Sequence, residues 1–363
     1  MSNSQLGVHT IAEILSEPET WKACVAELEE TRQLQSLSLT IPKGAECVFV
    51  GCGSSYYIAM VAANTWTILT GEPARALPAS EILLFPQCLP KPCQPVLISR
   101  SGHTSEVLEV VGLLEDQLHL RTIAITCGTD TPIEKLSTHV ICLAAADEKS
   151  TVMTRSFTSM LLALQGLAAE RAGNKDFSNS FHRLASEVGV QLDGIHAKIR
   201  SLVNQHSFAD YVFLGQGPFY GVAQEATLKV AEMSCSYAQC FHTLEFRHGP
   251  KAIVGPETLV TFFLSETGND SEVSVLEEIK NLGGTTLAVT NSADSTARKS
   301  SDCLIELSLD VPEAARAAAM VIPGQLLGFY TGVAKGLNPD EPRNLTRVVM
   351  LEGEGGGARR AAT

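Results

Sequence analysis

Two stretches of the sequence match each other: Cys47-Val48-Phe49-Val50-Gly51-Cys52-Gly53-Ser54-Ser55-Tyr56 and, 164 residues later, Tyr211-Val212-Phe213-Leu214-Gly215-Gln216-Gly217-Pro218-Phe219-Tyr220. Each has the pattern of a short apolar strand, a turn of small residues and the start of a helix. The same offset places Glu245 over Glu81. Because several anchors share one offset, the sequence predicts a tandem duplication of one α/β unit.

The rest of the chain keeps this alternation, with further apolar strands expected at 95–98, 122–126 and 139–143 and amphipathic helices between them. Such alternation is typical of a parallel sheet with helices on both faces. We therefore predict an α/β fold made of two doubly wound, flavodoxin-like parallel-sheet domains. The expected segments are an N-terminal helical segment (1–36), a first α/β domain (37–173), a helical linker (174–206), a second α/β domain (207–340) and a C-terminal loop and tail (341–363).

The composition narrows the possible function classes. The chain has 363 residues, 45% of them hydrophobic, and a net charge of −13. A chain this acidic is a poor partner for nucleic acid or for an anionic membrane. No signal peptide is recognisable after Met1, and the most apolar stretch, 317–334, contains Pro323 and is expected to be too short to span a bilayer.

The ten cysteines are scattered and include no Cys-x-x-Cys pair. Neither a zinc site nor a disulfide framework is expected from this spacing. We interpret the cysteines as reduced, mostly buried thiols of a cytoplasmic protein.

In the first copy, hydroxyl side chains gather at two strand-to-helix turns. Ser54 and Ser55 follow Gly53, while the second turn surrounds Gly102 with Ser99, Ser101 and Thr104. Helix N-termini offer unpaired N–H groups and the positive end of the helix dipole, so added hydroxyls would complete a phosphate cradle. The alternative is that these residues are ordinary helix caps.

The equivalent turns of the second copy carry Pro218 in one case and the carboxylates Glu266 and Asp270 in the other. Carboxylates would repel a phosphate. The sequence therefore predicts that only the first α/β domain grips an anion.

Charged residues recur along a predicted helix of the second copy, where Glu225, Lys229 and Glu232 stand at positions i, i+4 and i+7. This spacing places all three side chains on one helix face. The pattern fits a catalytic row of acid and base groups, and it equally fits a solvated ladder of ion pairs.

Together these motifs resemble the sugar isomerase (SIS) domain family, and the whole chain resembles the isomerase half of glucosamine-6-phosphate synthase. The motifs that carry the resemblance are Cys52-Gly53-Ser54-Ser55, Ser99-Arg100-Ser101-Gly102-His103-Thr104, Thr154-Arg155-Ser156-Phe157-Thr158, Glu225 to Glu232, Arg247-His248-Gly249-Pro250 and Glu341-Pro342-Arg343-Asn344-Leu345. We expect no glutaminase half and no glutamine-dependent activity. The chain is more similar to the stand-alone members, which are phosphosugar isomerases, amino-sugar-phosphate deaminases and deglycases.

The resemblance implies a role for each matching residue. Glu232 matches the base that moves a proton between C1 and C2 of the open-chain sugar, and Glu225 and Lys229 match neighbours that hold this base and the sugar. His248 matches the group that opens the sugar ring from the other subunit, which implies a homodimer; taken alone, it could be a buried structural histidine. The residues that match phosphate contacts are Ser55, Ser99, Ser101 and Thr104, with Ser54 and the backbone of Arg100 close by. No metal and no organic cofactor is implied.

The chain departs from the family pattern at three positions. Arg347 stands where the synthase has a lysine that forms an imine, and a guanidinium cannot do so. Met153 replaces a hydroxyl-bearing sugar contact, and His103 replaces an acidic residue. We therefore expect an isomerase or deaminase acting on a small 6-phosphorylated sugar, with a deglycase of fructosamine phosphates or a non-catalytic phosphosugar sensor as alternatives.

Overall fold

The computed structural model describes residues 6–348 of the chain. It contains two five-stranded sheets in which every pairing is parallel. Their strand orders are β2-β1-β3-β4-β5 and β10-β9-β8-β6-β7. The second order, read from the other edge, repeats the first, and both match the flavodoxin-like arrangement. The predicted tandem of doubly wound α/β domains is therefore confirmed.

The strands are four to six residues long, and most of their residues are buried. Those of the first sheet are β1 (Glu46–Gly51), β2 (Ala74–Pro78), β3 (Cys93–Ile98), β4 (Ile123–Thr126) and β5 (His139–Cys142). Those of the second sheet are β6 (Asp210–Gly215), β7 (Tyr237–His242), β8 (Thr258–Phe263), β9 (Thr285–Thr290) and β10 (Cys303–Glu306).

The helices of the first half and the linker are α1 (Val8–Leu15), α2 (Glu17–Thr31), α3 (Gln33–Thr40), α4 (Ser54–Thr70), α5 (Ala79–Leu84), α6 (Ser105–Gly112), α7 (Pro132–Leu136), α8 (Arg155–Ala172) and α9 (Lys175–Gln205). Those of the second half are α10 (Pro218–Ser234), α11 (Asn269–Asn281), α12 (Ser295–Ser300) and α13 (Ala317–Ala334). The predicted linker 174–206 corresponds to α9, and the predicted C-terminal segment begins after α13. Beyond residue 348 that predicted tail lies outside the described residues, as do residues 1–5.

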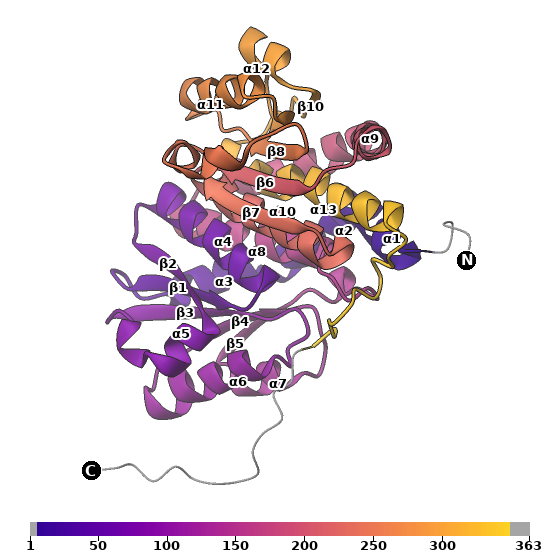
Figure 1. The fold of residues 1–363 in the computed structure, drawn as a ribbon. Helices are drawn as coiled ribbons and strands as arrows, with labels where there is room; N and C mark the ends of the chain where they lie inside the picture. The colour runs from indigo at the N-terminus through magenta and orange to yellow at the C-terminus, as the bar shows by residue number, and fades with distance from the viewer. Residues whose placement is uncertain (1–5, 349–363) are drawn as a thin grey trace.

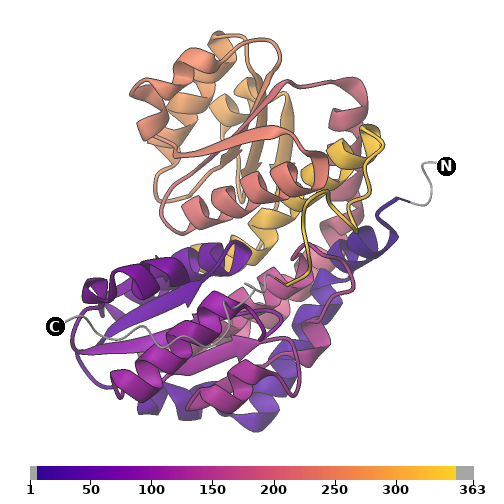
Figure 2. The same ribbon diagram turned by 60° about the horizontal axis from the view of Figure 1, so that its bottom comes forward.

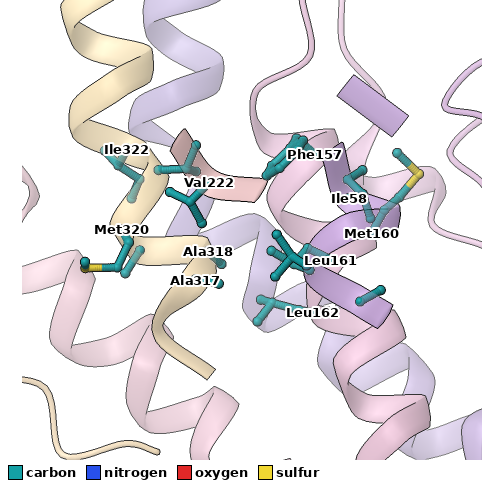
Figure 3. Close-up of a cluster of buried hydrophobic side chains, with 14 of the residues drawn as sticks. Ile58, Phe157, Met160, Leu161, Leu162, Val222, Ala317, Ala318, Met320 and Ile322 are labelled. Carbon is teal, nitrogen blue, oxygen red and sulfur yellow. The ribbon is translucent and has the colours of Figure 1, made fainter. Parts of the chain in front are cut away.

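The two sheets share one layer of helices. Helices α4, α8, α9, α10 and α13 lie between the sheets, while α5 to α7 cover the outer face of the first sheet and α11 and α12 that of the second (Figures 1 and 2). The buried apolar residues accordingly form one large central cluster that spans both halves and two smaller outer clusters. Side chains of α4, α8, α10 and α13 meet in the central cluster (Figure 3). The halves are thus packed as one body.

Helix α10 is held against α13 at very short range. A side chain on Gly324, Gly328 or Gly332 of α13 would collide with α10. For the last two, the nearest obstacle is α10 backbone, 2.6 Å from a Cβ at Gly328 and 2.3 Å from one at Gly332. Because close-packed backbones leave no room for side chains, this glycine stripe fixes the position of α10 in the molecule.

The helical stretch Glu313–Ala334 is long and apolar enough to cross a membrane by length and composition alone, contrary to the expectation that it is too short. Within the structure 83% of its most apolar window is buried. It serves here as the central helix of the shared core. All ten cysteines lie in the described part of the chain and are unpaired there.

Candidate active site

The two hydroxyl-bearing turns lie side by side at the carboxyl ends of the paired strands β1 and β3. In a doubly wound sheet this is the switch point, where one connection leaves to each side and a crevice opens. Gly53, with φ 55° and ψ −127°, begins the first turn in a backbone conformation that favours glycine. A cleft of about 220 Å³ opens there, lined by Cys52, Gly53, Ser54, Ser55, Arg100, Ser101, Thr104, Thr151, Met153, Leu228, Glu232, Thr346, Arg347 and Val348.

Hydrogen bonds within the second turn orient its hydroxyls. The hydroxyls of Ser99 and Thr104 lie 3.1 Å apart, and the Gly102 N–H donates to Ser99 Oγ at 3.2 Å. The His103 N–H donates to Ser101 Oγ at 3.2 Å. Within the described chain no hydrogen bond engages the hydroxyl of Ser55. Ser55, Ser101 and Thr104 are thus the hydroxyl residues of these turns that line the cleft besides Ser54. Ser99 does not line it and stabilises the second turn by hydrogen bonds.

The Arg100 side chain is engaged by backbone carbonyls of the protein itself. Its guanidinium, only 6% exposed, donates to the carbonyl oxygens of Thr151 at 3.0 Å, Val152 at 3.2 Å and Arg347 at 2.9 Å. It also lies 3.6 Å from the buried carboxylate of Glu148. Arg100 therefore ties the second turn to two other segments that line the cleft.

Helix α10 forms a further side of the cleft, and Glu225, Lys229 and Glu232 share one face of it, as their spacing predicts. Glu225 is fully buried, the Lys229 side chain is 1% exposed, and that of Glu232 is 19% exposed. Lys229 Nζ lies 3.3 Å from Glu225 Oε1 and 2.5 Å from Glu232 Oε2. Such burial excludes the solvated ladder of ion pairs, and only Glu232 of the three lines the cleft.

Burial and neighbouring charges shift the pKa values of Glu225 and Lys229. Burial raises the pKa of Glu225 to about 8, and the nearby charge of Lys229 only partly offsets this effect. Burial also acts to lower the pKa of Lys229, but the two flanking carboxylates outweigh it and leave that pKa raised. Lys229 is therefore a permanent cation beside Glu232, with Glu225 as a weak buried acid behind it.

The C-terminal segment closes another side of the cleft, where Thr346, Arg347 and Val348 return from the second half to the first (Figure 1). The Arg347 guanidinium is 44% exposed and pairs with Asp147 at 2.6 Å. Its charge is thus shared with a carboxylate from the loop before α8. The sequence placed Arg347 and Met153 at the site but did not point to Thr151 and Thr346, which belong to no local motif. It also did not point to Leu228, which lies within the motif Glu225 to Glu232 but lines the cleft.

His248 stands apart from this cleft. It is exposed, follows the short 3₁₀ turn η5 (Glu245–Arg247), and does not line the cleft that holds Glu232. Across residues 6–348 no side chain bonds or pairs with its imidazole. The alternative of a buried structural histidine is therefore wrong.

The second half has a matching cleft of about 560 Å³ at its own switch point. Gly217, with φ 53° and ψ −129°, repeats the backbone of Gly53. At the 164-residue offset, however, Pro218 stands in place of Ser54 and Ile68 in place of Glu232, and both line this cleft.

A carboxylate of the chain itself occupies the anion-binding turn of this second cleft. Glu313 accepts hydrogen bonds from the backbone N–H groups of Glu266 at 2.5 Å and Thr267 at 3.2 Å, and from the Thr267 hydroxyl at 2.6 Å. The donors that would hold a phosphate are therefore already taken.

Within residues 6–348 no group of three or more His, Cys, Asp or Glu side chains is arranged to hold a metal ion.

Comparison with known proteins agrees with this architecture. A sequence model of the SIS domain matches the chain twice, over residues 43–169 and 210–331. The chain is 25% identical over 344 residues to the glutamine–fructose-6-phosphate aminotransferase of Methanothermobacter thermautotrophicus, covering 94% of this chain and 57% of that protein. It is 28% identical over 331 residues to the protein of the same name from Lactiplantibacillus plantarum, covering 86% and 53%. The chain thus spans a little over half the length of these relatives.

Solved structures cover the chain almost completely. The glucosamine-6-phosphate deaminase of Thermotoga maritima is 30% identical with a TM-score of 0.79, covering 94% of this chain and 99% of that one. The tagatose-6-phosphate ketose/aldose isomerase of Escherichia coli has a TM-score of 0.82 at 22% identity, covering 96% and 97%. The second likeness is one of fold alone.

Proposed function

The chain belongs to the SIS domain family, and from that premise we propose that it is a phosphosugar enzyme that releases ammonia from a 6-phosphorylated amino sugar such as glucosamine 6-phosphate. The observation that carries the proposal is the cleft that Glu232 shares with the hydroxyls of Ser55, Ser101 and Thr104. A carboxylate at one end and a hydroxyl-rich anion cradle at the other suit a sugar bound by its phosphate. The 30% identity to a structure of a glucosamine-6-phosphate deaminase supports this substrate class.

Glu232 would act as the proton carrier. In the open-chain amino sugar, its carboxylate accepts the proton from C2 while the C1 carbonyl oxygen is protonated, which gives an enolamine. Glu232 then returns its proton to C1, and the electrons of the enolamine form an iminium at C2. Water adds at C2, ammonia leaves, and the ketose phosphate remains. Without an amino group, the same proton transfer interconverts aldose and ketose.

Lys229 would hold the Glu232 carboxylate in position by a direct hydrogen bond. The ammonium lies 2.5 Å from Glu232 Oε2, and its raised pKa keeps it charged. A charged amine is not a nucleophile, so Lys229 cannot substitute for the imine-forming lysine that Arg347 replaces. We therefore propose acid–base ring opening rather than a covalent imine.

His248 would supply this ring opening from a second copy of the chain. It is exposed, without a bonded partner in the described chain, and outside its own cleft. A homodimer would bring such an exposed side chain to the other copy's cleft. The unpaired cysteines support a reducing compartment such as the cytoplasm.

One assay tests the proposal: the purified protein is incubated with glucosamine 6-phosphate without glutamine, and ammonia and fructose 6-phosphate are measured together. Equal amounts of both products are expected. Ketose–aldose interconversion without ammonia would make the protein an isomerase only. Binding without either product would contradict the proposal, and fructosamine 6-phosphates would then be tested because Met153 and Leu228 give the cleft an apolar wall.

A further inference from the structure

Ser54 belongs to the phosphate turn by sequence but is bonded elsewhere. Its Oγ donates a hydrogen bond to Glu225 Oε1 at 3.1 Å and accepts one from Lys229 Nζ at 3.3 Å. Ser54 begins α4 in the first half, whereas both partners belong to α10 in the second half. The hydroxyl therefore bridges the joint between the halves, directly behind Glu232.

The single proton of the hydroxyl decides what Ser54 can bind. A serine has one O–H donor, and the oxygens of an ionised phosphate are acceptors. In Ser54 that proton is donated to Glu225 Oε1. Within the described residues Glu225 Oε2 is buried without a partner, and Oε1 is the oxygen that accepts from Ser54. Ser54 has no second proton to offer a phosphate, whereas the hydroxyl of Ser55 is unbonded within the described chain.

The same hydroxyl completes the surroundings of Lys229. An ammonium has three donors, and Lys229 has three acceptors in reach: Ser54 Oγ at 3.3 Å, Glu225 Oε1 at 3.3 Å and Glu232 Oε2 at 2.5 Å. The contacts with Ser54 and Glu232 are hydrogen bonds, and that with Glu225 is an ion pair, so together they hold the ammonium beside Glu232. Loss of the Ser54 hydroxyl would leave one donor and one buried carboxyl oxygen underbonded.

The internal duplication supplies an independent comparison. At the 164-residue offset, Ser54 corresponds to Pro218, Glu225 to Val61 and Lys229 to Thr65. All three polar groups of this unit are thus replaced together where the same two helices, α4 and α10, meet in the reverse roles beside the second cleft. Val61 is fully buried against Gly221 at the equivalent place in the helix contact.

We propose that Ser54 is a positioning residue that sets Lys229 and Glu225 behind the base Glu232, and not a ligand of the substrate phosphate. The proposal rests on the proposed function in taking Glu232 as the base. The proposal gives the first turn two roles, because one of its two neighbouring serines binds the phosphate and the other positions the residues that transfer the proton. Ser55 faces the phosphate, and Ser54 faces the proton-transfer machinery.

The test compares three variants: Ser54→Ala, Ser54→Thr and Ser55→Ala. Ser180→Ala is the control for loss of a buried serine hydroxyl. In the described chain the Ser180 hydroxyl bonds only the carbonyl of Phe177, within α9. For Ser54→Ala we expect kcat to fall about 10- to 100-fold with KM within about twofold, which corresponds to one or two lost hydrogen bonds to charged groups. Ser54→Thr, which keeps the hydroxyl, should recover most of kcat. Ser55→Ala should instead raise KM, and Ser180→Ala should change neither constant.

Calorimetry with fructose 6-phosphate separates this proposal from the proposed function, because binding is measured without turnover. Unchanged affinity in Ser54→Ala, beside weakened affinity in Ser55→Ala, supports the assignment even if glucosamine 6-phosphate proves not to be a substrate. An equal loss of affinity for fructose 6-phosphate in both variants would show that Ser54 binds the phosphate and would overturn the proposal. Wild-type kcat in Ser54→Ala would overturn it as well.

Discussion

Arg100 in the phosphate turn donates a hydrogen bond at 2.9 Å to the backbone carbonyl of Arg347, 247 residues further along the chain. The same guanidinium bonds the carbonyls of Thr151 and Val152 and lies beside Glu148. The turn predicted to bind phosphate and the segment that closes the cleft are therefore joined by one buried cation.

Replacing Arg100 should weaken both the fold and substrate binding. In Arg100→Gln, buried Glu148 loses its cation and the carbonyls of Thr151, Val152 and Arg347 lose the hydrogen bonds of the guanidinium, so we expect the free energy of unfolding to fall by about 2–4 kcal/mol. KM should also rise, because the closing segment is no longer held. Denaturant unfolding and steady-state kinetics measure the two effects. Arg75→Gln is the matched control, since its exposed pair with Glu46 is worth about 1 kcal/mol or less.

Glu232→Gln should abolish turnover without abolishing binding. The amide cannot accept the C2 proton, so we expect kcat to fall at least about 100-fold while the calorimetric affinity for fructose 6-phosphate persists. Near-normal turnover in this variant would show that another group is the base.

Removal of the cradle hydroxyls should weaken all phosphosugars alike. Ser101→Ala combined with Thr104→Ala deletes two donors to a charged ligand, and we expect Kd to rise at least about tenfold. Calorimetry with several sugar phosphates and with inorganic phosphate measures the change. An affinity equal to that of the wild type would show that Ser101 and Thr104 do not bind the phosphate.

Mixed dimers should reveal a site shared between two copies. His248→Ala and Glu232→Gln proteins are each expected to be inactive, and mixing them after dissociation should restore about a quarter of wild-type activity. The reason is that half of the dimers are then mixed and each contains one intact site. If the mixture stays as inactive as its components, His248 does not act across the interface.

Stability at alkaline pH should depend on Glu17, which is fully buried and for which no described residue hydrogen-bonds either carboxyl oxygen. Burial raises its pKa well above the ordinary 4.5, and nearby Gln325 only partly offsets this. The folded state therefore favours the neutral acid, whose stabilising contribution is complete below about pH 4.5 and is lost as pH rises toward the raised pKa.

The variant Glu17→Gln removes this titration. Between pH 6 and pH 9 its melting temperature should fall less than that of the wild type, with a difference of about 1–3 kcal/mol in unfolding free energy at pH 9. Glu30→Gln, at an exposed position of the same helix α2, is the control for loss of a carboxylate and should keep the wild-type pH profile. Parallel profiles for Glu17→Gln and the wild type would mean that Glu17 is ionised in the fold.

Much of this architecture could be predicted from the sequence because its signals are local. An apolar strand followed by a small-residue turn appears twice, and parallel strands must bring their carboxyl ends to one edge. The side of α10 shared by Glu225, Lys229 and Glu232 follows from the helical repeat alone.

The remaining features depend on contacts across the chain. Ser54 and Ser55 are adjacent at the start of one helix, where successive side chains diverge by about 100°. Which of them faces a phosphate and which faces Glu225 is decided by where α10 packs. The carbonyls that Arg100 holds, and the carboxylate that pairs with Arg347, likewise carry no local pattern.

The two unequal clefts also bear on how such a chain can evolve. In a homodimer of single units, every substitution appears in both clefts at once, so a base could not be lost from one without being lost from the other. Fusion of two copies into one gene removes that constraint. Ile68 and Glu313 could then arise at one cleft while Glu232 and the hydroxyls persisted at the other. Duplication here created an asymmetry that separate identical subunits cannot reach.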